Sequence, residues 1–251
     1  MYINLDRKLW KSLTAEFVGC FFLNFFGCGA CVASNCYGFG PADDSQTHLP
    51  AGDIALCAAF AFGGVIVVNI VVIGPVSGCQ INPAVTIGFM TVGMMPIPRG
   101  LLYIVVQVLG CLTGTGALST LIPYRWWTLH IAPNLLNESK GVDIGKGFAY
   151  ETLMTFVLMA VVLAVTDDRR PEPHPHVALV IGVTVGAAVF CGVFATGTSL
   201  NPARTLGSAI VSEEYTNVWV YCTAPTLGAV LAAQGYHWVL KDRKKPGEFV
   251  G

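Results

Sequence analysis

Two copies of the triplet Asn-Pro-Ala are the residues of this sequence whose chemistry stands out. They are Asn82-Pro83-Ala84 and Asn201-Pro202-Ala203. Asparagine is among the best N-capping residues, and proline is favoured at the first helical position because its missing N–H would be unpaired there in any case. Each triplet therefore predicts the start of a helix, and the two asparagine amides could donate hydrogen bonds to a passing oxygen.

The segments that contain the triplets, 78–95 and 197–212, are too apolar for ordinary loops and too short to span a membrane. A helix of about ten residues reaches roughly 15 Å, half of a hydrocarbon core of about 30 Å. Two such half-helices starting together near the midplane would direct partial positive charge at one point and repel cations and protons. Non-helical backbone is tolerated at this depth only where it lines a wet cavity. The carbonyls expected to line it belong to Gly78, Cys79, Gln80, Gly197, Thr198 and Ser199.

The elements that must position the triplets are membrane-spanning helices. Of the 251 residues, 54% are hydrophobic and only 12% are charged, and the apolar residues fall in long unbroken stretches, which is typical of a membrane protein. We predict an all-α membrane protein in which residues 1–251 form one channel domain with six transmembrane helices and two re-entrant half-helices. The predicted spans are 12–34, 54–74, 100–122, 148–166, 177–195 and 217–240.

The two halves of the chain repeat one another. The pattern of glycines and of the triplet in 78–88 matches that in 197–207. The halves are predicted to extend over about 12–122 and about 148–240. Because three spans per half is an odd number, the halves enter the membrane in opposite directions, and an inverted repeat of broken helices places its conducting site near the midplane.

Three charged residues fall within the apolar segments. Arg204 follows the second triplet, where a guanidinium facing lipid would be costly, so we expect it to face an aqueous pore. Its counterpart in the first half is Val85, which makes the pore chemically asymmetric. Glu16 and Glu151 lie at matching places in the first and fourth spans. A proton relay is one interpretation, but their symmetry favours buried structural carboxylates that accept backbone N–H bonds from the two loops.

The distribution of basic residues predicts the orientation. Most Lys and Arg residues fall on the side that holds both termini, so both termini are expected to be cytoplasmic. Asn137-Glu138-Ser139 then lies outside and is a candidate glycosylation sequon. Most of the nine cysteines lie in or beside apolar segments and are interpreted as packing residues; whether Cys31 and Cys36 pair outside is left open.

Composition and motifs also exclude functions. A net charge of -1 gives no reason to expect a nucleic-acid partner. We find no nucleophile–base pair, metal-ligand cluster or phosphate-binding loop, so neither an enzyme nor a cofactor or metal site is predicted. A coupled transporter would normally need a carboxylate beside one of the triplets, and neither triplet has one.

With these residues in view, the sequence resembles the aquaporin (major intrinsic protein) family along essentially its whole length. The segments that carry the resemblance are 77–86 and 197–204, together with Glu16 and Glu151. The resemblance implies a right-handed helical bundle that forms a homotetramer with one pore per subunit.

The resemblance also implies a narrow selectivity constriction near the outer mouth. The four matching positions are Phe62, Val189, Thr198 and Arg204. Phe62 and Arg204 are similar to water-selective members, but Val189 stands where those members usually have histidine, so a wider and less polar opening is expected. An insect group of glycerol-passing members (entomoglyceroporins) is similar in that one respect.

Some other positions resemble water-selective members, and others depart from residues that are common in the family. Thr205 stands where glycerol facilitators typically have Asp, and Ala209 stands where they typically have a basic residue. Gln80 occupies a position that is often histidine, so histidine-linked gating is not implied. Thr198 replaces the cysteine that confers mercury sensitivity on many members.

The sequence thus predicts a passive channel for water that also admits glycerol and urea and excludes protons and ions. Its partners would be the lipid bilayer, the permeating solutes and other copies of the chain, in a multi-pass protein of the plasma membrane. Two alternatives stay open: a strictly water-selective channel, and a structural or adhesive membrane protein with little conductance. The intact triplets, Arg204 and short tails argue against the last.

Overall fold

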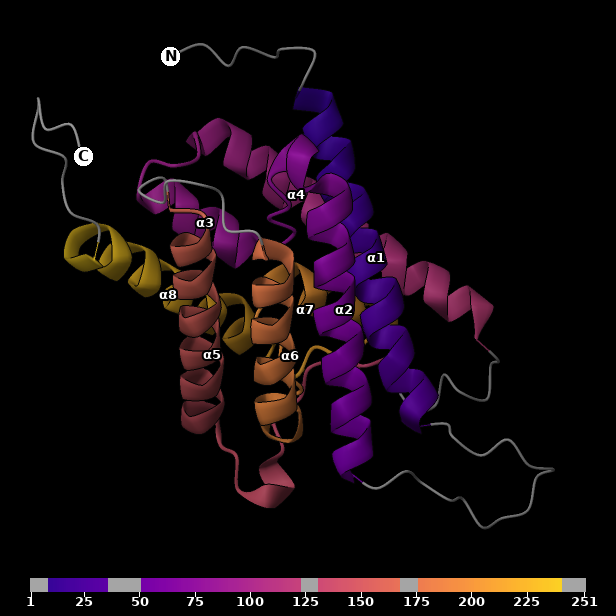
Figure 1. Cartoon of the computed structure of the whole chain (residues 1–251). Helices are drawn as coiled ribbons and strands as arrows, with labels where there is room; N and C mark the ends of the chain where they lie inside the picture. The colour runs from indigo at the N-terminus through magenta and orange to yellow at the C-terminus, as the bar shows by residue number, and fades with distance from the viewer. Residues whose placement is uncertain (1–8, 36–50, 123–130, 168–175, 241–251) are drawn as a thin grey trace, which may run out of the picture.

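A bundle of long helices surrounds two short ones in the computed structural model, which describes residues 9–35, 51–122, 131–167 and 176–240 (Figure 1). The long helices are α1 (Leu9–Asn35), α2 (Ala51–Ser77), α4 (Ile97–Leu121), α5 (Ile144–Val165), α6 (Val177–Thr196) and α8 (Val218–Gly235). The short helices are α3 (Pro83–Thr91) and α7 (Pro202–Ser212), and a 3₁₀ turn, η2, covers Glu138–Lys140. This arrangement confirms the predicted all-α membrane fold.

In the described residues, five helices are long and apolar enough to cross a membrane, namely α1, α2, α4, α5 and α6. The sixth predicted span, 217–240, is α-helical only as far as Gly235 and continues as a π-helical turn, η3 (Tyr236–Leu240). Its 18 α-helical residues are the fewest of any long helix. The sixth helix is therefore found where it was predicted, but its α-helical part is shorter than the predicted span.

The first half-helix is shorter than the predicted segment. It ends at Thr91, because Gly93 adopts a left-handed conformation with φ +74°. The N–H of Met94 then bonds back to the Phe89 carbonyl at 3.0 Å, which satisfies a carbonyl at the helix end. The chain thus leaves the half-helix before it reaches Pro96 at the start of α4.

The long helices pack in pairs within each half and across the halves. α1 packs on α4 and α2, α5 packs on α8 and α6, and α2 and α6 join the two halves. Glycines permit the close approach: a Cβ added to Gly63 of α2 would lie 2.7 Å from the Gly182 carbonyl of α6. Small residues at such crossings are how helices gain van der Waals contact in lipid.

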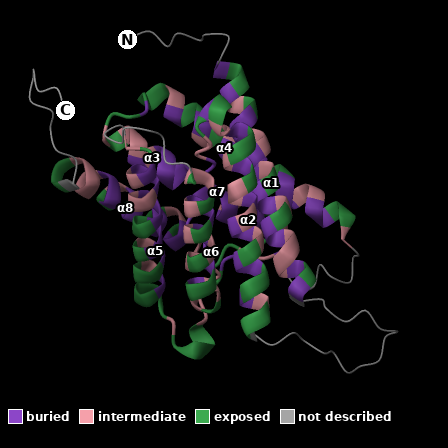
Figure 2. Ribbon diagram, viewed as in Figure 1, coloured by how far each residue is buried: buried purple, intermediate pink, exposed green. Residues whose placement is uncertain are grey.

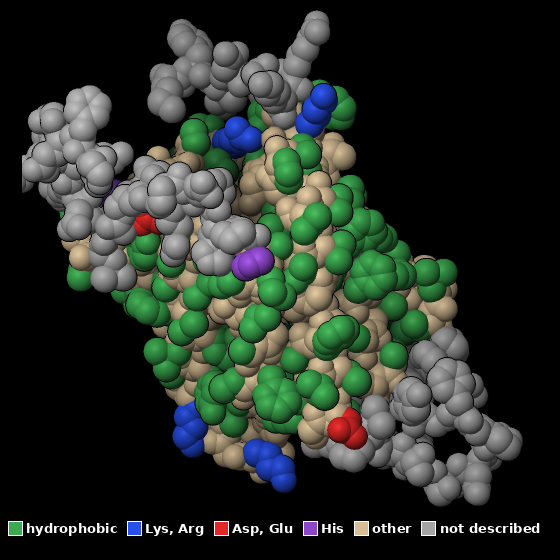
Figure 3. Space-filling model, viewed as in Figure 1, with side chains coloured by type: hydrophobic (Ala, Val, Ile, Leu, Met, Phe, Trp, Pro, Cys, Tyr) green, Lys and Arg blue, Asp and Glu red, His purple; other side chains and the backbone are tan. Residues whose placement is uncertain are grey.

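The surface of the bundle is apolar and its interior holds the polar groups. Large hydrophobic side chains such as Phe60 of α2 (81% exposed) and Leu153 of α5 (65% exposed) point outward, and exposed residues follow the outer sides of α2, α5 and α6 (Figure 2). On the face in Figure 3, Lys and Arg gather at the two ends and hydrophobic side chains cover the belt between them. Glu16, Gln107 and Glu151 are fully buried. This is the distribution expected of a protein that has lipid around it.

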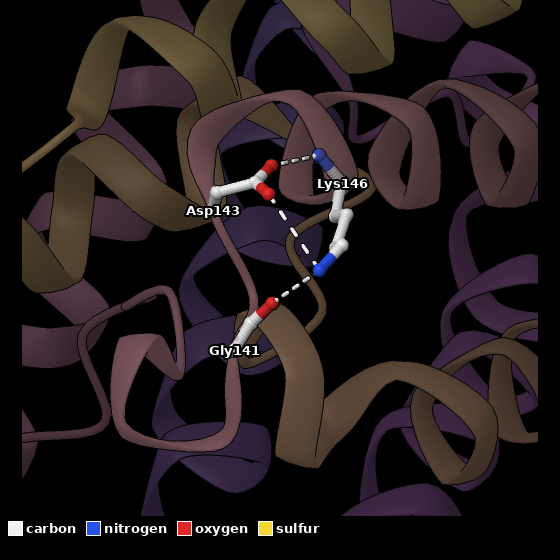
Figure 4. A network of polar contacts seen from close by, with 3 residues as sticks. All are labelled: Gly141, Asp143 and Lys146. Atoms are coloured by element: carbon white, nitrogen blue, oxygen red, sulfur yellow. Dashed lines mark hydrogen bonds and ion pairs between the residues drawn. The ribbon is translucent and has the colours of Figure 1, made fainter.

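A polar contact network fixes the start of α5 (Figure 4). Asp143 is the N-cap, and its carboxylate accepts the Lys146 backbone N–H at 2.8 Å. The Lys146 ammonium lies 3.6 Å from the same carboxylate and donates to the Gly141 carbonyl at 2.6 Å. The Lys146 backbone N–H, followed by the Lys146 charge, holds the pKa of Asp143 below its usual range. The second half of the chain thus begins with a defined cap.

Candidate functional site: the central pore

The two triplets meet at the centre of the bundle. Asn82 caps α3 by accepting the Ala84 N–H at 2.9 Å, and Asn201 caps α7 by accepting the Ala203 N–H at 3.0 Å. Each asparagine also bonds the opposite half: Asn82 Nδ2 donates to the Leu200 carbonyl and Asn201 Nδ2 donates to the Ile81 carbonyl, both at 2.8 Å. A side-chain amide carries two hydrogens. Each asparagine therefore keeps one N–H beyond the bond that ties the two halves together.

The loops before the triplets share an unusual backbone. In the first loop Gly78, Cys79 and Ile81 have φ of +89°, +49° and +41°. The second loop repeats this at matching positions, as φ is +74° at Gly197, +43° at Thr198 and +56° at Leu200. Left-handed conformations of non-glycine residues cost of order 1–3 kcal/mol each and persist only where the surroundings hold them.

Glu16 holds the first loop. Its carboxylate accepts the backbone N–H groups of Gln80 at 3.0 Å and Ile81 at 2.6 Å. It also accepts the Ser77 hydroxyl at 2.6 Å and the Gln107 side-chain amide at 2.9 Å. Four donors therefore surround a carboxylate that is fully buried.

Glu151 holds the second loop in the same manner. It accepts the backbone N–H groups of Ser199 and Leu200, each at 2.9 Å, and the Thr196 hydroxyl at 2.6 Å. Buried charge is stable only where hydrogen bonds replace its hydration. The two carboxylates thus supply the contacts that the left-handed loop residues require.

These bonds determine where the loop carbonyls point. The peptide bonds of the described residues are trans, so each carbonyl points away from the N–H of the following residue. Because the N–H groups of Gln80 and Ile81 face Glu16, the carbonyls of Cys79 and Gln80 face the opposite way. The same argument turns the carbonyls of Thr198 and Ser199 away from Glu151.

A cavity of about 130 Å³ lies on that opposite side and takes its walls from both halves of the chain. Both asparagines line it, as do all six residues whose carbonyls were predicted to face the pore except Gly197. The Gly197 carbonyl instead accepts Asn134 Nδ2 at 2.8 Å. A cavity of this size has room for several waters, which the polar groups on one part of its wall can bind. The apolar part of its wall includes Ile70, Phe89, Val162, Ile181 and Val185.

The structure brings the four residues of the predicted constriction to the same cavity. Phe62, Val189, Thr198 and Arg204 all line it. The Arg204 guanidinium carbon lies 5.1 Å from the centre of the Phe62 ring, within the range of a cation–π contact. In the described part of the chain, Thr198 Oγ1 and Arg204 Nε are buried without a hydrogen-bond partner. Unmet donors and acceptors in a cavity are sites for water or a solute.

Asn134 is a residue of this site that sequence reasoning missed. Its Oδ1 accepts Arg204 Nη1 and the Thr205 hydroxyl, each at 2.6 Å. The Ala132 carbonyl accepts the same Arg204 nitrogen at 2.8 Å. The stretch 131–137 therefore fixes the arginine from outside the two loops. The available signal was the apolar Ile131, now 2% exposed, in a short connection, which indicates a segment packed onto the protein.

Two further predictions concern connections between helices. Asn137 Nδ2, the atom to which a glycan would attach, donates one of its two hydrogens to the Phe194 carbonyl at 2.8 Å, which leaves the other hydrogen for replacement by a glycan. Glycosylation of Asn137 stays a prediction. Cys31 lies at the end of α1, while its proposed partner Cys36 lies outside the described residues.

Comparisons with known proteins agree with this geometry. Residues 5–236 match the family model described as major intrinsic protein. The lens fiber major intrinsic protein of Lithobates pipiens is 33% identical over 238 residues, which cover 95% of this chain and 84% of that protein. Aquaporin FA-CHIP of Pelophylax lessonae is also 33% identical, over 94% of this chain and 85% of its own length. The structure of the aquaglyceroporin from Plasmodium falciparum superposes with a TM-score of 0.74 at 25% identity, covering 92% of this chain and 97% of that chain.

Proposed function

Because this chain belongs to the major intrinsic protein family, we propose that it is a passive pore for water that also admits small uncharged solutes such as glycerol and urea. At the coarser level it is a multi-pass membrane channel protein for water or small solutes, and it is not an enzyme. The observation that carries the finer proposal is the side chain of Val189, which is apolar and 3% exposed at the wall of the cavity beside Phe62 and Arg204.

The cavity wall is divided into a polar and an apolar part. The polar part holds the loop carbonyls, the two asparagine amides and Arg204, and the apolar part holds Phe62, Val189 and other aliphatic side chains. A glycerol molecule has hydroxyls along one edge and carbon along the other, so it matches both parts. Pockets of this kind select by the few placed polar groups and by diameter. Valine in place of an imidazole leaves more of that diameter free.

Ions meet two electrostatic obstacles in the proposed pore. The N-termini of α3 and α7 meet where Asn82 and Asn201 bond across the two halves. Helix N-termini carry partial positive charge, which is unfavourable for cations and protons. Arg204 adds a full positive charge to the same cavity. The wall carbonyls and amides replace the hydration of a neutral solute and only a fraction of that of an ion.

A strictly water-selective channel is the second candidate, and the Phe62–Arg204 contact favours it. A guanidinium held 5.1 Å from an aromatic ring narrows the passage from two sides whatever stands at position 189. We also propose that copies assemble into homotetramers in the plasma membrane with both termini cytoplasmic. The apolar belt of Figure 3 supports a place in a membrane, and the excess of Lys and Arg in the segments on the side of the termini supports the orientation.

Stopped-flow light scattering on reconstituted liposomes tests the proposal, using sucrose, glycerol and urea gradients. We expect fast water flow and measurable glycerol and urea entry. Val189→His should reduce solute entry by about tenfold while water flow survives, and Val189→Ala should raise it, because diameter at this point sets the barrier. Fast water flow without solute entry in the wild type would leave the water-selective alternative. Folded tetramers that pass neither would support the structural role.

A further inference from the structure

The side chain of Gln80 is a group of the pore that the proposed function does not use. Its backbone N–H donates to Glu16, and the residue is partly buried and lines the cavity. The first loop leaves α2 at Ser77, whose carbonyl accepts the hydroxyl of Tyr103, which in turn accepts from Arg99. Gln80 therefore lies on the Arg99 side of the asparagine pair, away from the constriction.

A directed chain of hydrogen bonds sets the orientation of this side chain. Gln107 Nε2 donates to the Glu16 carboxylate at 2.9 Å and to the Thr86 hydroxyl at 3.1 Å. Thr86 therefore accepts from Gln107 and has one proton to give. Its shortest contact is with Gln80 Oε1 at 2.7 Å, while the Asn82 carbonyl at 3.0 Å is the usual backward contact of a helical threonine.

The length of the Thr86–Gln80 contact identifies the Gln80 atom. A distance of 2.7 Å is typical of O–H···O bonds, whereas N–H···O bonds centre near 2.9–3.0 Å. Oxygen therefore faces Thr86, and Nε2 keeps both of its hydrogens. No described residue accepts from Gln80 Nε2. The cavity-lining part of the first loop thus combines the two amide hydrogens of Gln80 with the carbonyls of Cys79 and Gln80.

The matching residue of the second loop offers nothing comparable. Ser199 Oγ contacts the Thr205 hydroxyl at 2.6 Å, and that hydroxyl gives its own proton to Asn134. The Asn201 N–H donates to Ser199 Oγ as well, at 3.2 Å. The Ser199 hydroxyl therefore makes its hydrogen bonds to residues of its own half. At this loop position, therefore, only the first half has a side-chain donor without an acceptor among the described residues.

We propose that the Gln80 amide is a second solute-selecting group of this channel, in series with the constriction. It pairs N–H donors with adjacent carbonyl acceptors, and this combination fits a neutral solute that both accepts and donates, with urea as the best match. The proposal deepens the proposed function and rests on it. Water can use the same groups, but urea engages donor and acceptor together, so its passage depends more strongly on Gln80.

The test compares wild type with Gln80→Met, which keeps the length of the side chain and removes both polar atoms. Gln234→Met is the matched control, because Gln234 bonds the Thr91 carbonyl at the end of α3 and lies outside this cavity. Urea entry and osmotic water flow are measured in liposomes by stopped flow. We expect Gln80→Met to lower the urea-to-water permeability ratio about threefold to tenfold, the size of one or two lost neutral hydrogen bonds. The control should leave the ratio unchanged.

A second measurement separates this proposal from the proposed function. Water flow is recorded in liposomes that contain equal urea concentrations inside and outside, so that urea acts only by occupying the pore. Urea should slow water flow in wild type and not in Gln80→Met. A wild type that passes no urea but shows this slowing would refute the proposed solute conduction and retain the Gln80 site. Equal slowing in both proteins, or an unchanged permeability ratio, would overturn the Gln80 proposal.

Discussion

The two pore loops have the same backbone and different chemistry. Each follows a helix that ends in a hydroxyl residue, Ser77 or Thr196, and each hydroxyl donates to the buried glutamate at 2.6 Å and accepts the N–H two residues on at 3.1 Å. A tyrosine of the following long helix donates to the carbonyl of that hydroxyl residue, Tyr103 in the first half and Tyr221 in the second. The scaffold of each loop is therefore built by the same set of contacts.

The contacts beyond this scaffold differ. The first loop is braced through Gln107 of α4, within its own half, and its half-helix presents Val85 to the cavity. The second is braced through Asn134, in the connection between the halves, and presents Arg204. The two halves thus share the glutamate, hydroxyl and tyrosine contacts that hold the left-handed loop backbone. They differ in the side chains that line the cavity. The geometry of the loops and the selectivity of the pore are therefore set by different residues.

The largest expected effect comes from the two glutamates, and it tests whether the scaffolds are equivalent. Glu16→Gln and Glu151→Gln each replace one accepting oxygen with an amide that faces a backbone N–H. Leaving a buried donor unpaired costs about 1–3 kcal/mol, and more at charged groups, so both variants should be strongly destabilised. The measurement is the thermal unfolding midpoint in detergent. Midpoints lowered by similar amounts support equivalent loops, whereas one unaffected variant would show that the two loops are held by different contacts.

The sequence predicted the duplicated part of this structure because repeated local signals encode it. The Asn-Pro-Ala triplets specify two helix starts, and the unbroken apolar stretches specify the long helices around them. The early ends of α3 and α8 were not predicted, since a left-handed Gly93 and a π-helical turn after Gly235 compete with an apolar pattern that continues. The end of a helix depends on which backbone N–H and C=O groups find hydrogen-bond partners, and the hydrophobic pattern of the sequence does not predict these partners.

The divergent part was less accessible to sequence reasoning. The asparagine amides were expected to serve a solute, yet each gives one hydrogen to the opposite loop, at Leu200 or Ile81. Those bonds join segments far apart in the chain, and only the assembled bundle brings them within reach. Asn134 was missed for the same reason, because nothing local in 131–137 indicates an arginine partner.

An intermediate effect is expected at Asn134, and it sharpens the distinction between the loops. Asn134→Ala removes the 2.6 Å acceptor of Arg204 and of Thr205 and the donor to the Gly197 carbonyl. We expect a stability loss of about 1–3 kcal/mol. We also expect a less firmly held Arg204, which should lower the water-to-glycerol permeability ratio by a few-fold. Both are measured on purified protein, by thermal unfolding and by liposome stopped flow.

The matched control for that variant is Asn137→Ala in the same connection. The Asn137 side chain donates to the Phe194 carbonyl and, among the described residues, makes no hydrogen bond to either loop, so its removal should leave the permeability ratio as in wild type. A shift of the ratio in both variants would mean that the whole connection, rather than the Asn134 contact, positions Arg204.

The smallest effect is expected at Asp143, which belongs to the second half but contacts neither pore loop. Its folded-state pKa is held below the usual range, first by the Lys146 backbone N–H and then by the Lys146 charge. A depressed pKa means that the carboxylate adds stability above its unfolded-state pKa and that this stability is lost as pH falls through the folded-state pKa. Asp143→Asn should therefore lower the unfolding midpoint slightly at neutral pH and not at all in acid. Because the cap is exposed to solvent, the difference should also shrink in high salt. Permeability ratios should stay at the wild-type value at every pH and salt concentration. A change in the ratios would show that the start of α5 is coupled to the second loop. Stability and selectivity would then depend on the same contacts in this half.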